Sequence, residues 1–399
     1  MVTIGIIREE KKPYDKRVAF LPEQCTELTE RFPGIRILVQ PSPHRCVADE
    51  LYAEAGFELK EDLSECDILF GVKEVPVEAL IDGKTYLFFS HTIKKQPHNR
   101  KLLRTILQKN IRLIDYETLV WHDGGRVLGF GRYAGIVGTH NGFLTFGRKT
   151  GNFDLQPAWK CANYKALVEQ YRTLSLPPVR IALCGDGRVA HGCLELLRAI
   201  GIREVTPQEF LEEQFHVPVY VHLRPEDFYA HKDGEVWDKA DFYHQPENYI
   251  SSFRPYTRVC DLMINAIFWH EKIPRFFSKE DMKARDFQIK VIADISCDIN
   301  GSIPATLRDT TIEDPVFGYH PLTESEEAPY LKNTIDIMAV GNLPCELPYD
   351  ASKGFGEQLL RHVMGPLLGK ADDPVIQGAT LTHDGKLLPK YAYLHDYVA

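Results

Sequence analysis

The sequence lacks the features that mark several common classes of protein. Its nine cysteines are scattered from Cys25 to Cys345, and no two of them form a Cys-x-x-Cys pair. An odd number of cysteines without metal-ligand spacing argues against a disulfide framework and a zinc finger, and predicts reduced thiols in a cytoplasmic protein. No apolar run approaches the roughly 18 residues that a membrane helix needs. The short apolar start meets the charged residues Arg8 to Lys12 too soon for a signal peptide.

An excess of positive charge is also absent. Lys and Arg total 47 against 56 Asp and Glu, which gives a formal net charge of −9. This balance argues against nucleic acid or an anionic membrane surface as a partner, although it leaves room for local basic pockets. Hydrophobic residues make up 44% of the 399 positions, which is typical of a globular chain long enough for two or three domains.

The first third of the sequence alternates short apolar runs with amphipathic stretches. This alternation is typical of βαβ units and predicts a parallel sheet. The expected strands are residues 3–7, 35–39, 67–72, 85–90 and 111–116, and the expected helices are 22–32, 49–56 and 97–109.

Ionisable residues follow four of these strands directly. Ligands of an open α/β sheet bind outside the carboxyl ends of its strands, so charges gathered there predict a site. One polar residue at a strand end is ordinary, but an arginine, a lysine, a histidine and a glutamate at one edge form a set. Its members are Arg8, Glu9 and Arg17, then Lys73 and Glu74, then His91 and Lys94, and finally Glu117.

The rest of the chain reads as a second α/β unit. Residues 133–148 are rich in small side chains, which favours a tightly packed linking helix. The second unit begins at Val179, and strands are expected at 261–268 and 289–295. Residues 208–255 are expected to form an irregular insertion. A helical pattern at 351–368 is expected to pack back on the first domain.

A glycine-rich turn opens this second unit. An apolar strand ends at Cys184, and a helical pattern starts at His191. Between them, glycines allow a tight turn and a close approach to a pyrophosphate, and a small residue permits close helix packing. The strand–turn–helix context therefore predicts a dinucleotide-binding loop made of Gly185, Asp186, Gly187, Arg188, Val189 and Ala190.

The preference for one dinucleotide depends on the next strand. An acidic residue about 20 positions after the glycines would hold the ribose of NAD. The expected strand, residues 204–206, ends before Pro207 without such a residue, and Glu209 lies beyond the proline. A 2′-phosphate would then meet no repulsion, and Arg188 or Arg203 would favour it. The sequence thus favours NADP(H), with NAD(H) as the alternative.

Several short segments along the chain carry a family resemblance. They include RVAFLP at 17–22, GVKEVP at 71–76, FFSHTIK at 88–94, RLIDYE at 112–117, FGRYAG at 130–135, DISCD at 294–298 and NLP at 342–344. In these segments the chain resembles the alanine dehydrogenase and saccharopine dehydrogenase group, and most closely its lysine-forming saccharopine dehydrogenases, also called lysine–ketoglutarate reductases. The resemblance covers essentially the whole chain in order.

The resemblance implies a two-domain α/β enzyme with two Rossmann-like domains and parallel sheets. Residues 1–132 and 343–399 would form a discontinuous substrate or catalytic domain, and residues 133–342 an inserted NAD(P)-binding domain. The implied reaction is the reductive condensation of L-lysine with 2-oxoglutarate to saccharopine, or the reverse. These three compounds are the expected partners, and a homo-oligomer stays an open alternative.

The resemblance also assigns roles to the charges at the sheet edge. Lys73 and His91 would be the acid–base pair, and Glu117 would tune the lysine. The cations that would bind substrate are Arg17, Lys94 and Arg126, and Asp298 joins the cofactor residues. These residue types suit the chemistry, since amine oxidation needs a base near nitrogen and both substrates carry carboxylates.

Two features keep other functions open. The lysine-forming branch usually has an aspartate where this chain has Gly341 before Asn342, and Asp298 matches an aspartate that works in alanine dehydrogenases. Alanine dehydrogenase or another imine-reducing dehydrogenase is therefore one alternative, and a non-catalytic NADP-binding sensor is another. The histidines are dispersed, and no metal site is expected.

Overall fold

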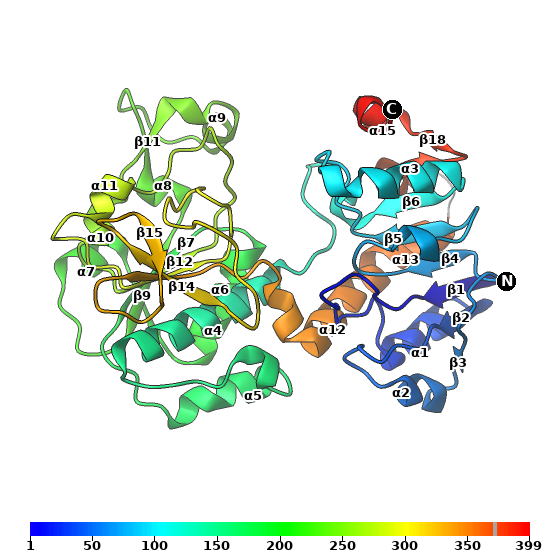
Figure 1. The fold of residues 1–399 in the computed structure, drawn as a ribbon, viewed down its shortest axis with the longest axis horizontal. Helices are drawn as coiled ribbons and strands as arrows, with labels where there is room; N and C mark the ends of the chain where they lie inside the picture. The colour runs from blue at the N-terminus through cyan, green and yellow to red at the C-terminus, as the bar shows by residue number, and fades with distance from the viewer. Residues whose placement is uncertain (370–372) are drawn as a thin grey trace. The chain divides into compact units, whose positions relative to one another are not determined.

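A computed structural model describes residues 1–369 and 373–399 of the chain. It divides into two compact units, one formed by residues 1–130 and 348–399 and the other by residues 131–347. The domain boundaries expected from the sequence lie two and five residues from these divisions. Residues from both ends of the chain therefore share the first unit, as the blue and red parts of the ribbon show (Figure 1).

The first unit is built on an eight-stranded sheet in the order β18-β17-β6-β5-β4-β1-β2-β3. All neighbours from β6 to β3 are parallel, whereas β17 runs antiparallel to β6 and to β18. The strands are β1 (Val2–Ile6), β2 (Ile35–Val39), β3 (Glu58–Leu59), β4 (Ile68–Phe70), β5 (Thr85–Phe88), β6 (Arg112–Asp115), β17 (Thr380–His383) and β18 (Lys386–Leu387).

Apolar residues cover both faces of this sheet. Along β2, Ile37 and Val39 join one core cluster while Leu38 joins the other, as the two-residue repeat of a strand requires. Helices α1, α12, α13 and α14 pack on the first face, and α3 and α15 on the second. The helices are α1 (Pro22–Arg31), α2 (Asp49–Glu54), α3 (Arg100–Gln108), α12 (Pro348–Gln358), α13 (Met364–Gly369), α14 (Pro374–Ala379) and α15 (His395–Val398).

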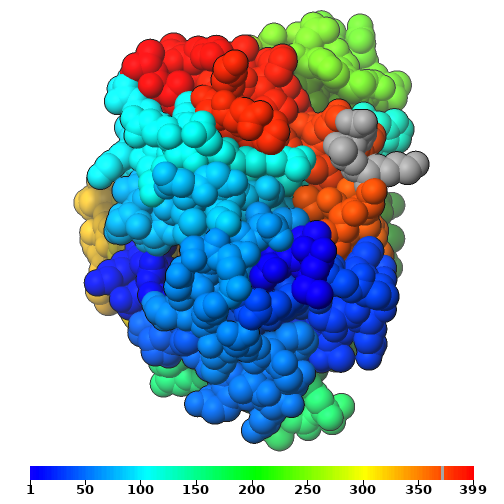
Figure 2. Space-filling view, turned by 90° about the vertical axis from the view of Figure 1, so that its right-hand side faces the viewer, coloured from blue at the N-terminus to red at the C-terminus, as the bar shows by residue number. Residues whose placement is uncertain are grey.

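The C-terminal segment is an integral part of the first unit. Helix α15 packs on α3, where Arg100 Nε donates to the Tyr397 carbonyl at 2.7 Å and Arg104 donates to the carbonyls of Val398 and Ala399. Figure 2 shows the red C-terminal atoms lying over the cyan atoms of α3. The helical pattern expected at 351–368 is present as α12, one π-helical turn (Leu359–Val363) and α13.

The second unit holds another eight-stranded sheet, in the order β15-β14-β16-β13-β12-β7-β9-β8. Strands from β16 to β8 are parallel, and β14 and β15 are antiparallel additions. The strands are β7 (Arg180–Cys184), β8 (Arg203–Val205), β9 (Val219–Leu223), β12 (Leu262–Asn265), β13 (Val291–Asp294), β14 (Val316–His320), β15 (Ser325–Glu327) and β16 (Ile335–Met338), and a separate hairpin pairs β10 (Tyr229–His231) with β11 (Tyr249–Ser251).

Close helix packing explains the small residues after position 130. A Cβ at Gly135 would lie 2.0 Å from the Val189 carbonyl oxygen, and one at Gly192 would lie 2.0 Å from the Arg132 carbonyl oxygen. Only glycine lets these helices approach so closely. The helices of this unit are α4 (Gly131–Thr150), α5 (Tyr164–Glu169), α6 (Arg188–Ala199), α7 (Pro207–Glu212), α8 (Pro225–Phe228), α9 (Lys239–His244), α10 (Arg254–Thr257) and α11 (Lys279–Met282).

One expectation from the sequence is wrong. Residues 208–255 are not irregular, because they contain β9, which lies between β7 and β8 in the main sheet, and the β10–β11 hairpin. Strand β9 is only five residues long and follows a polar stretch, so its local pattern was weak. Its place as an interior strand of the sheet comes from long-range pairing with β7 and β8.

Candidate active site

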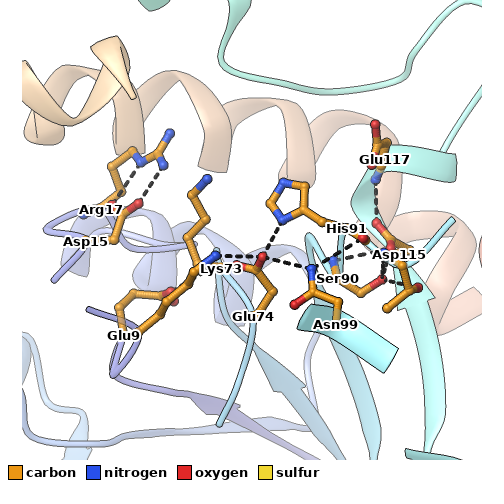
Figure 3. A network of polar contacts seen from close by, with 12 residues as sticks. Glu9, Asp15, Arg17, Lys73, Glu74, Ser90, His91, Asn99, Asp115 and Glu117 are labelled. Carbon is orange, nitrogen blue, oxygen red and sulfur yellow. Dashed lines mark hydrogen bonds and ion pairs between the residues drawn. The ribbon is translucent and has the colours of Figure 1, made fainter. Parts of the chain in front are cut away.

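The charges expected at one edge of the first sheet do lie there. Strands β1, β4, β5 and β6 are parallel and adjacent, so their carboxyl ends meet at the same edge. Figure 3 shows the side chains of Lys73 and His91 extending from neighbouring strand ends toward the same side. The same edge carries Glu9, Glu74, Asp115 and Glu117.

His91 is oriented by a buried carboxylate. Its Nδ1 lies 2.7 Å from Glu74 Oε1, and Lys11 Nζ lies 2.7 Å from the same oxygen. Burial alone would raise the pKa of Glu74, but the hydrogen bonds from His91 and Lys11 lower it to about 2. Because an ionised carboxylate only accepts, Nδ1 of His91 carries the proton in this pair. Nε2 is then the nitrogen available for proton exchange.

Lys73 is held through its backbone by Glu9. The Glu9 carboxyl accepts the Val72 N–H at 2.7 Å and the Lys73 N–H at 2.8 Å. Burial raises the pKa of Glu9 to about 8, with a further rise from the charge of Asp15. Glu9 was among the residues expected at this edge, but its hydrogen bond to the Lys73 backbone could not be predicted from the sequence.

Arg17 is buried and preorganised. Its Nε and Nη2 bond Asp15 Oδ1 and Oδ2 at 2.9 and 2.6 Å, and its guanidinium carbon lies 4.1 Å from the centre of the Phe130 ring. Only 3% of the Arg17 side chain is exposed. A bidentate carboxylate partner and an aromatic face fix the plane of the guanidinium.

Among the described residues, Glu117 forms an ion pair with Arg126 and not with a lysine. Its Oε1 is 3.0 Å from Arg126 Nη2. The Glu117 backbone is in turn fixed by Asp115, whose Oδ1 accepts the Glu117 N–H at 2.8 Å. The predicted effect of Glu117 on Lys73 therefore stays a prediction. Lys94, the third expected cation, is exposed.

Asp115 is a buried carboxyl at this edge of the sheet that was not singled out from the sequence. It is fully buried and accepts hydrogen bonds from the Ser90 N–H and hydroxyl, next to His91, as well as from Glu117. Burial raises the pKa of Asp115 to about 6, although these hydrogen bonds oppose the rise. A single carboxyl thus links the ends of β5 and β6. The sequence did contain one feature that could have identified Asp115, because an aspartate stands at the end of the apolar strand at 112–115.

The predicted dinucleotide loop has the expected geometry. Gly185 has φ +128°, and a Cβ there would lie 2.5 Å from the Ala266 carbonyl oxygen, so no side chain fits. A Cβ at Gly187 would meet nothing within 4 Å, which leaves open space at the start of α6. Asp186 and Arg188 are exposed, Val189 is partly buried, and Ala190 is buried against the sheet.

These features fit a dinucleotide. The open space above Gly187 lies where the amide groups and positive dipole end of a 12-residue helix would hold a pyrophosphate. Asp298, the other predicted cofactor residue, is partly buried in the loop after β13. That loop is anchored by buried Asp294, which accepts hydrogen bonds from Asn265 at 2.8 Å and Thr306 at 2.6 Å.

The dinucleotide loop of residues 185–190 is called the glycine loop below. The strand beside it is not the expected strand at 204–206. Strand β8 lies at the edge of the sheet, and β9 pairs directly with β7. The Gly185 N–H donates to the Leu223 carbonyl at 2.9 Å, and His222 Nε2 lies 2.7 Å from the Gly185 carbonyl oxygen. Arg203 begins β8 at the opposite, amino-terminal end, so it is not placed to meet a ribose phosphate.

Other features give little support to different chemistry. In the described ranges, no group of three or more His, Cys, Asp or Glu side chains is arranged to hold a metal ion. None of the nine cysteines, all described, forms a disulfide. Among the described helices, none has the length and apolar character needed to cross a membrane.

Together, the first unit places a lysine, a histidine, oriented carboxylates and a fixed arginine at one sheet edge. Lys73 and His91 can exchange protons with a substrate, and Arg17 and Arg126 supply positive charge. The second unit offers a cradle for a dinucleotide pyrophosphate. Proton transfer beside a small anionic substrate is the chemistry that this edge of the sheet supports.

Comparison with known proteins shows which families this chain resembles. Residues 5–137 match the family model of the alanine dehydrogenase/PNT N-terminal domain. The chain is 32% identical, over 98% of its length, to alpha-aminoadipic semialdehyde synthase from Rattus norvegicus, of which it covers 47%. It is 25% identical to the saccharopine dehydrogenase [NAD(+), L-lysine-forming] of Yarrowia lipolytica, covering 89% of both chains. The chain spans about half the length of the synthases that it matches.

Solved structures agree on the fold. An L-alanine dehydrogenase superposes with a TM-score of 0.67 at 15% identity over the full length of both chains. A transhydrogenase from Sinorhizobium meliloti gives 0.58 at 13% identity, covering 97% of this chain and 100% of its own. The expected fold class, two Rossmann-like α/β domains with largely parallel sheets, is confirmed, and so is the resemblance to the alanine and saccharopine dehydrogenase group.

Proposed function

We propose that this chain, a member of the alanine dehydrogenase and saccharopine dehydrogenase group, condenses L-lysine with 2-oxoglutarate reductively to saccharopine, or catalyses the reverse oxidation. The observation that carries the proposal is the pairing of His91 with ionised Glu74 beside Lys73 at one sheet edge. A relative named saccharopine dehydrogenase [NAD(+), L-lysine-forming] matches 89% of the chain, and its name supports saccharopine and L-lysine as substrates.

The acid–base roles follow from the chemistry of a secondary amine. In the oxidative direction the amine nitrogen must lose a proton before hydride leaves the adjacent carbon, and Lys73 is the base assigned to that step. Water then attacks the imine, and the carbinolamine breaks down to release lysine. His91, with Nδ1 fixed on Glu74, exchanges protons with water and the leaving amine through Nε2.

The cations of this edge serve the carboxylates of the substrates. Arg17 is held rigidly by Asp15 and Phe130, and rigid placement limits the entropy lost when substrate binds. Arg126 and Lys94 are exposed and add positive charge nearby. Glu117 fixes the position of Arg126 through their ion pair.

The proposed cofactor is a nicotinamide dinucleotide, with NADP(H) favoured over NAD(H). When bound, it supplies the hydride acceptor or donor. The residues proposed to hold it are the glycine-loop residues Gly185, Asp186, Gly187, Arg188, Val189 and Ala190, together with Asp298. The second unit is accordingly the proposed nucleotide domain, and the first is the proposed substrate domain.

The departure at Gly341 is compatible with the lysine reaction. A Cβ at Gly341 would meet only the Oδ2 atom of Asp309, 3.9 Å away. The carboxylate of Asp309 therefore lies near the position where the lysine-forming branch usually has an aspartate side chain. We also propose that the protein works in the cytoplasm, because none of its nine cysteines forms a disulfide, although some relatives are named mitochondrial.

The test follows the loss of reduced-nicotinamide absorbance with NADPH and then NADH. L-lysine plus 2-oxoglutarate is compared with ammonia plus pyruvate, and the product is identified by mass spectrometry. Formation of saccharopine would support the proposal. Lys73→Met and His91→Gln should each lower turnover by about 10²-fold or more while nucleotide binding, measured by calorimetry, stays unchanged.

The other outcomes separate the alternatives. Turnover only with ammonia and pyruvate would overturn the lysine assignment and make the protein an alanine dehydrogenase. Nucleotide binding without turnover of either pair would indicate an NADP-binding sensor. Full activity of both variants would show that the acid–base pair is assigned wrongly.

A further inference from the structure

The strand order of the second unit changes which residues face the adenosine half of a dinucleotide. In a Rossmann unit, the residue that follows the strand beside the glycine loop lies near the adenosine ribose. Here that strand is β9, which pairs with β7 along its whole length and ends at Leu223. The residue that follows it is Arg224.

Arg224 is held toward the glycine loop. Its Nε lies 3.6 Å from Oδ1 of Asp186, within the loop itself. About half of the Arg224 side chain is exposed, and in the described chain no hydrogen bond is recorded to its terminal amino groups. A guanidinium carries five N–H donors, so donors remain for a ligand at this place.

A pocket of about 180 Å³ lies beside the loop, within the second unit. The glycine loop forms one wall, and Glu226, directly after Arg224-Pro225, forms part of another. The segment between β10 and β11 adds Lys239 and Tyr243, and the loop after β12 adds Phe268. The Tyr243 and Phe268 rings, with centroids 6.5 Å apart, are both exposed and offer aromatic faces to a base.

The charges around this pocket are balanced. Asp186 and Glu226 are negative; burial raises the pKa of Tyr243, and these two charges add to the rise. Lys239 and Arg224 are positive. Two carboxylates alone would repel a phosphate, whereas two cations beside them can bind a dianion.

We propose that Arg224 and Lys239 form a clamp for the 2′-phosphate of NADP(H), with the adenine against the exposed rings of Tyr243 and Phe268. The clamp rests on the proposed nicotinamide cofactor, but not on which amino acid is the substrate. In this proposal the segment 224–243, which was expected from the sequence to be irregular, selects between the two dinucleotides. Arg224 and Lys239 take the phosphate-binding role that the sequence suggested for Arg203, which lies at the start of the edge strand β8.

Calorimetric binding of two nucleotides that differ by one phosphate tests the clamp. The pair is adenosine 2′,5′-bisphosphate and adenosine 5′-monophosphate, measured on the full chain without substrates. We expect the bisphosphate to bind the unaltered protein about 10-fold more tightly or better. Arg224→Gln and Lys239→Gln should each remove most of this difference while leaving monophosphate affinity within about twofold.

Two further variants sharpen the result. Arg203→Gln removes the same charge at the amino-terminal end of β8 and should leave both affinities unchanged. Glu226→Gln removes a carboxylate from the pocket and should strengthen bisphosphate binding. These two controls distinguish a local clamp from a general effect of net charge.

The clamp is refuted if the unaltered protein binds the monophosphate as tightly as the bisphosphate, or if Arg224→Gln and Lys239→Gln weaken both ligands equally. Its failure is separable from failure of the proposed function. Saccharopine formation with NADH and no selectivity for the bisphosphate would overturn the clamp alone. Bisphosphate selectivity without turnover of lysine and 2-oxoglutarate would uphold the clamp and overturn the reaction.

Discussion

Glu9 is a buried carboxyl whose replacement should change the pH dependence of stability. Its two oxygens accept the backbone N–H groups of Val72 and Lys73. Burial, with help from Asp15, raises the pKa of Glu9 from 4.5 to about 8. Between these values the folded chain keeps a proton that the unfolded chain has released. Stability therefore falls as pH rises through this window.

The size of the effect follows from the same shift. The difference between 4.5 and about 8, converted at about 1.4 kcal/mol per pH unit, gives roughly 5 kcal/mol as an upper limit. Glu9→Gln removes the titration but also turns one acceptor into an amide that cannot accept, which costs about 1–3 kcal/mol. The variant should thus be the less stable protein at pH 5. The gap should close or invert by pH 9, where the natural carboxyl is charged.

Urea unfolding from about pH 5 to pH 9 measures this gap, and hydrogen exchange at the Val72 and Lys73 amides reports directly on the two bonds. Glu10→Gln is the matched control, since Glu10 is partly exposed and bonds Arg8 instead. A gap between the natural protein and Glu9→Gln that stays constant across this range would refute the reasoning. Because Glu9 holds the Lys73 backbone, the variant should also lower the turnover rate.

Two more substitutions test other parts of the structure. Glu74→Gln keeps an acceptor for His91 but loses the charge, so the turnover rate should fall about 10-fold or more and its pH profile should shift; an unchanged profile would contradict the orienting role. Gly192→Ala places a Cβ 2.0 Å from a backbone oxygen of α4, so thermal denaturation should show a loss of about 1–3 kcal/mol or more. Gly365→Ala, where a Cβ meets nothing within 4 Å, should be neutral or stabilising, and equal losses in both alanine variants would contradict the packing argument.

Several features of this protein could be read from the sequence because they depend on neighbouring residues. The turn from Gly185 to Ala190 joins a strand to a helix, and each of its residues acts within that short segment. The edge that carries Lys73 and His91 could also be inferred, because parallel strands bring their carboxyl ends together whatever their exact order. The glycines of α4 predicted a tightly packed helix, and its partner proved to be α6.

The tertiary structure alone decided which groups contact one another. Whether β8 or β9 lies beside β7 depends on backbone pairing between distant segments. This order puts Arg224, and not a residue at the end of β8, directly after the strand that neighbours β7. The contact partners of long side chains could not be predicted from the sequence either, as the ion pair between Glu117 and Arg126 shows. Local sequence sets conformation over a few residues, whereas strand order and side-chain partners are set by which distant surfaces bury each other best. That physical difference explains why the sequence could predict which charged residues gather at the sheet edge, but not which side chains they contact.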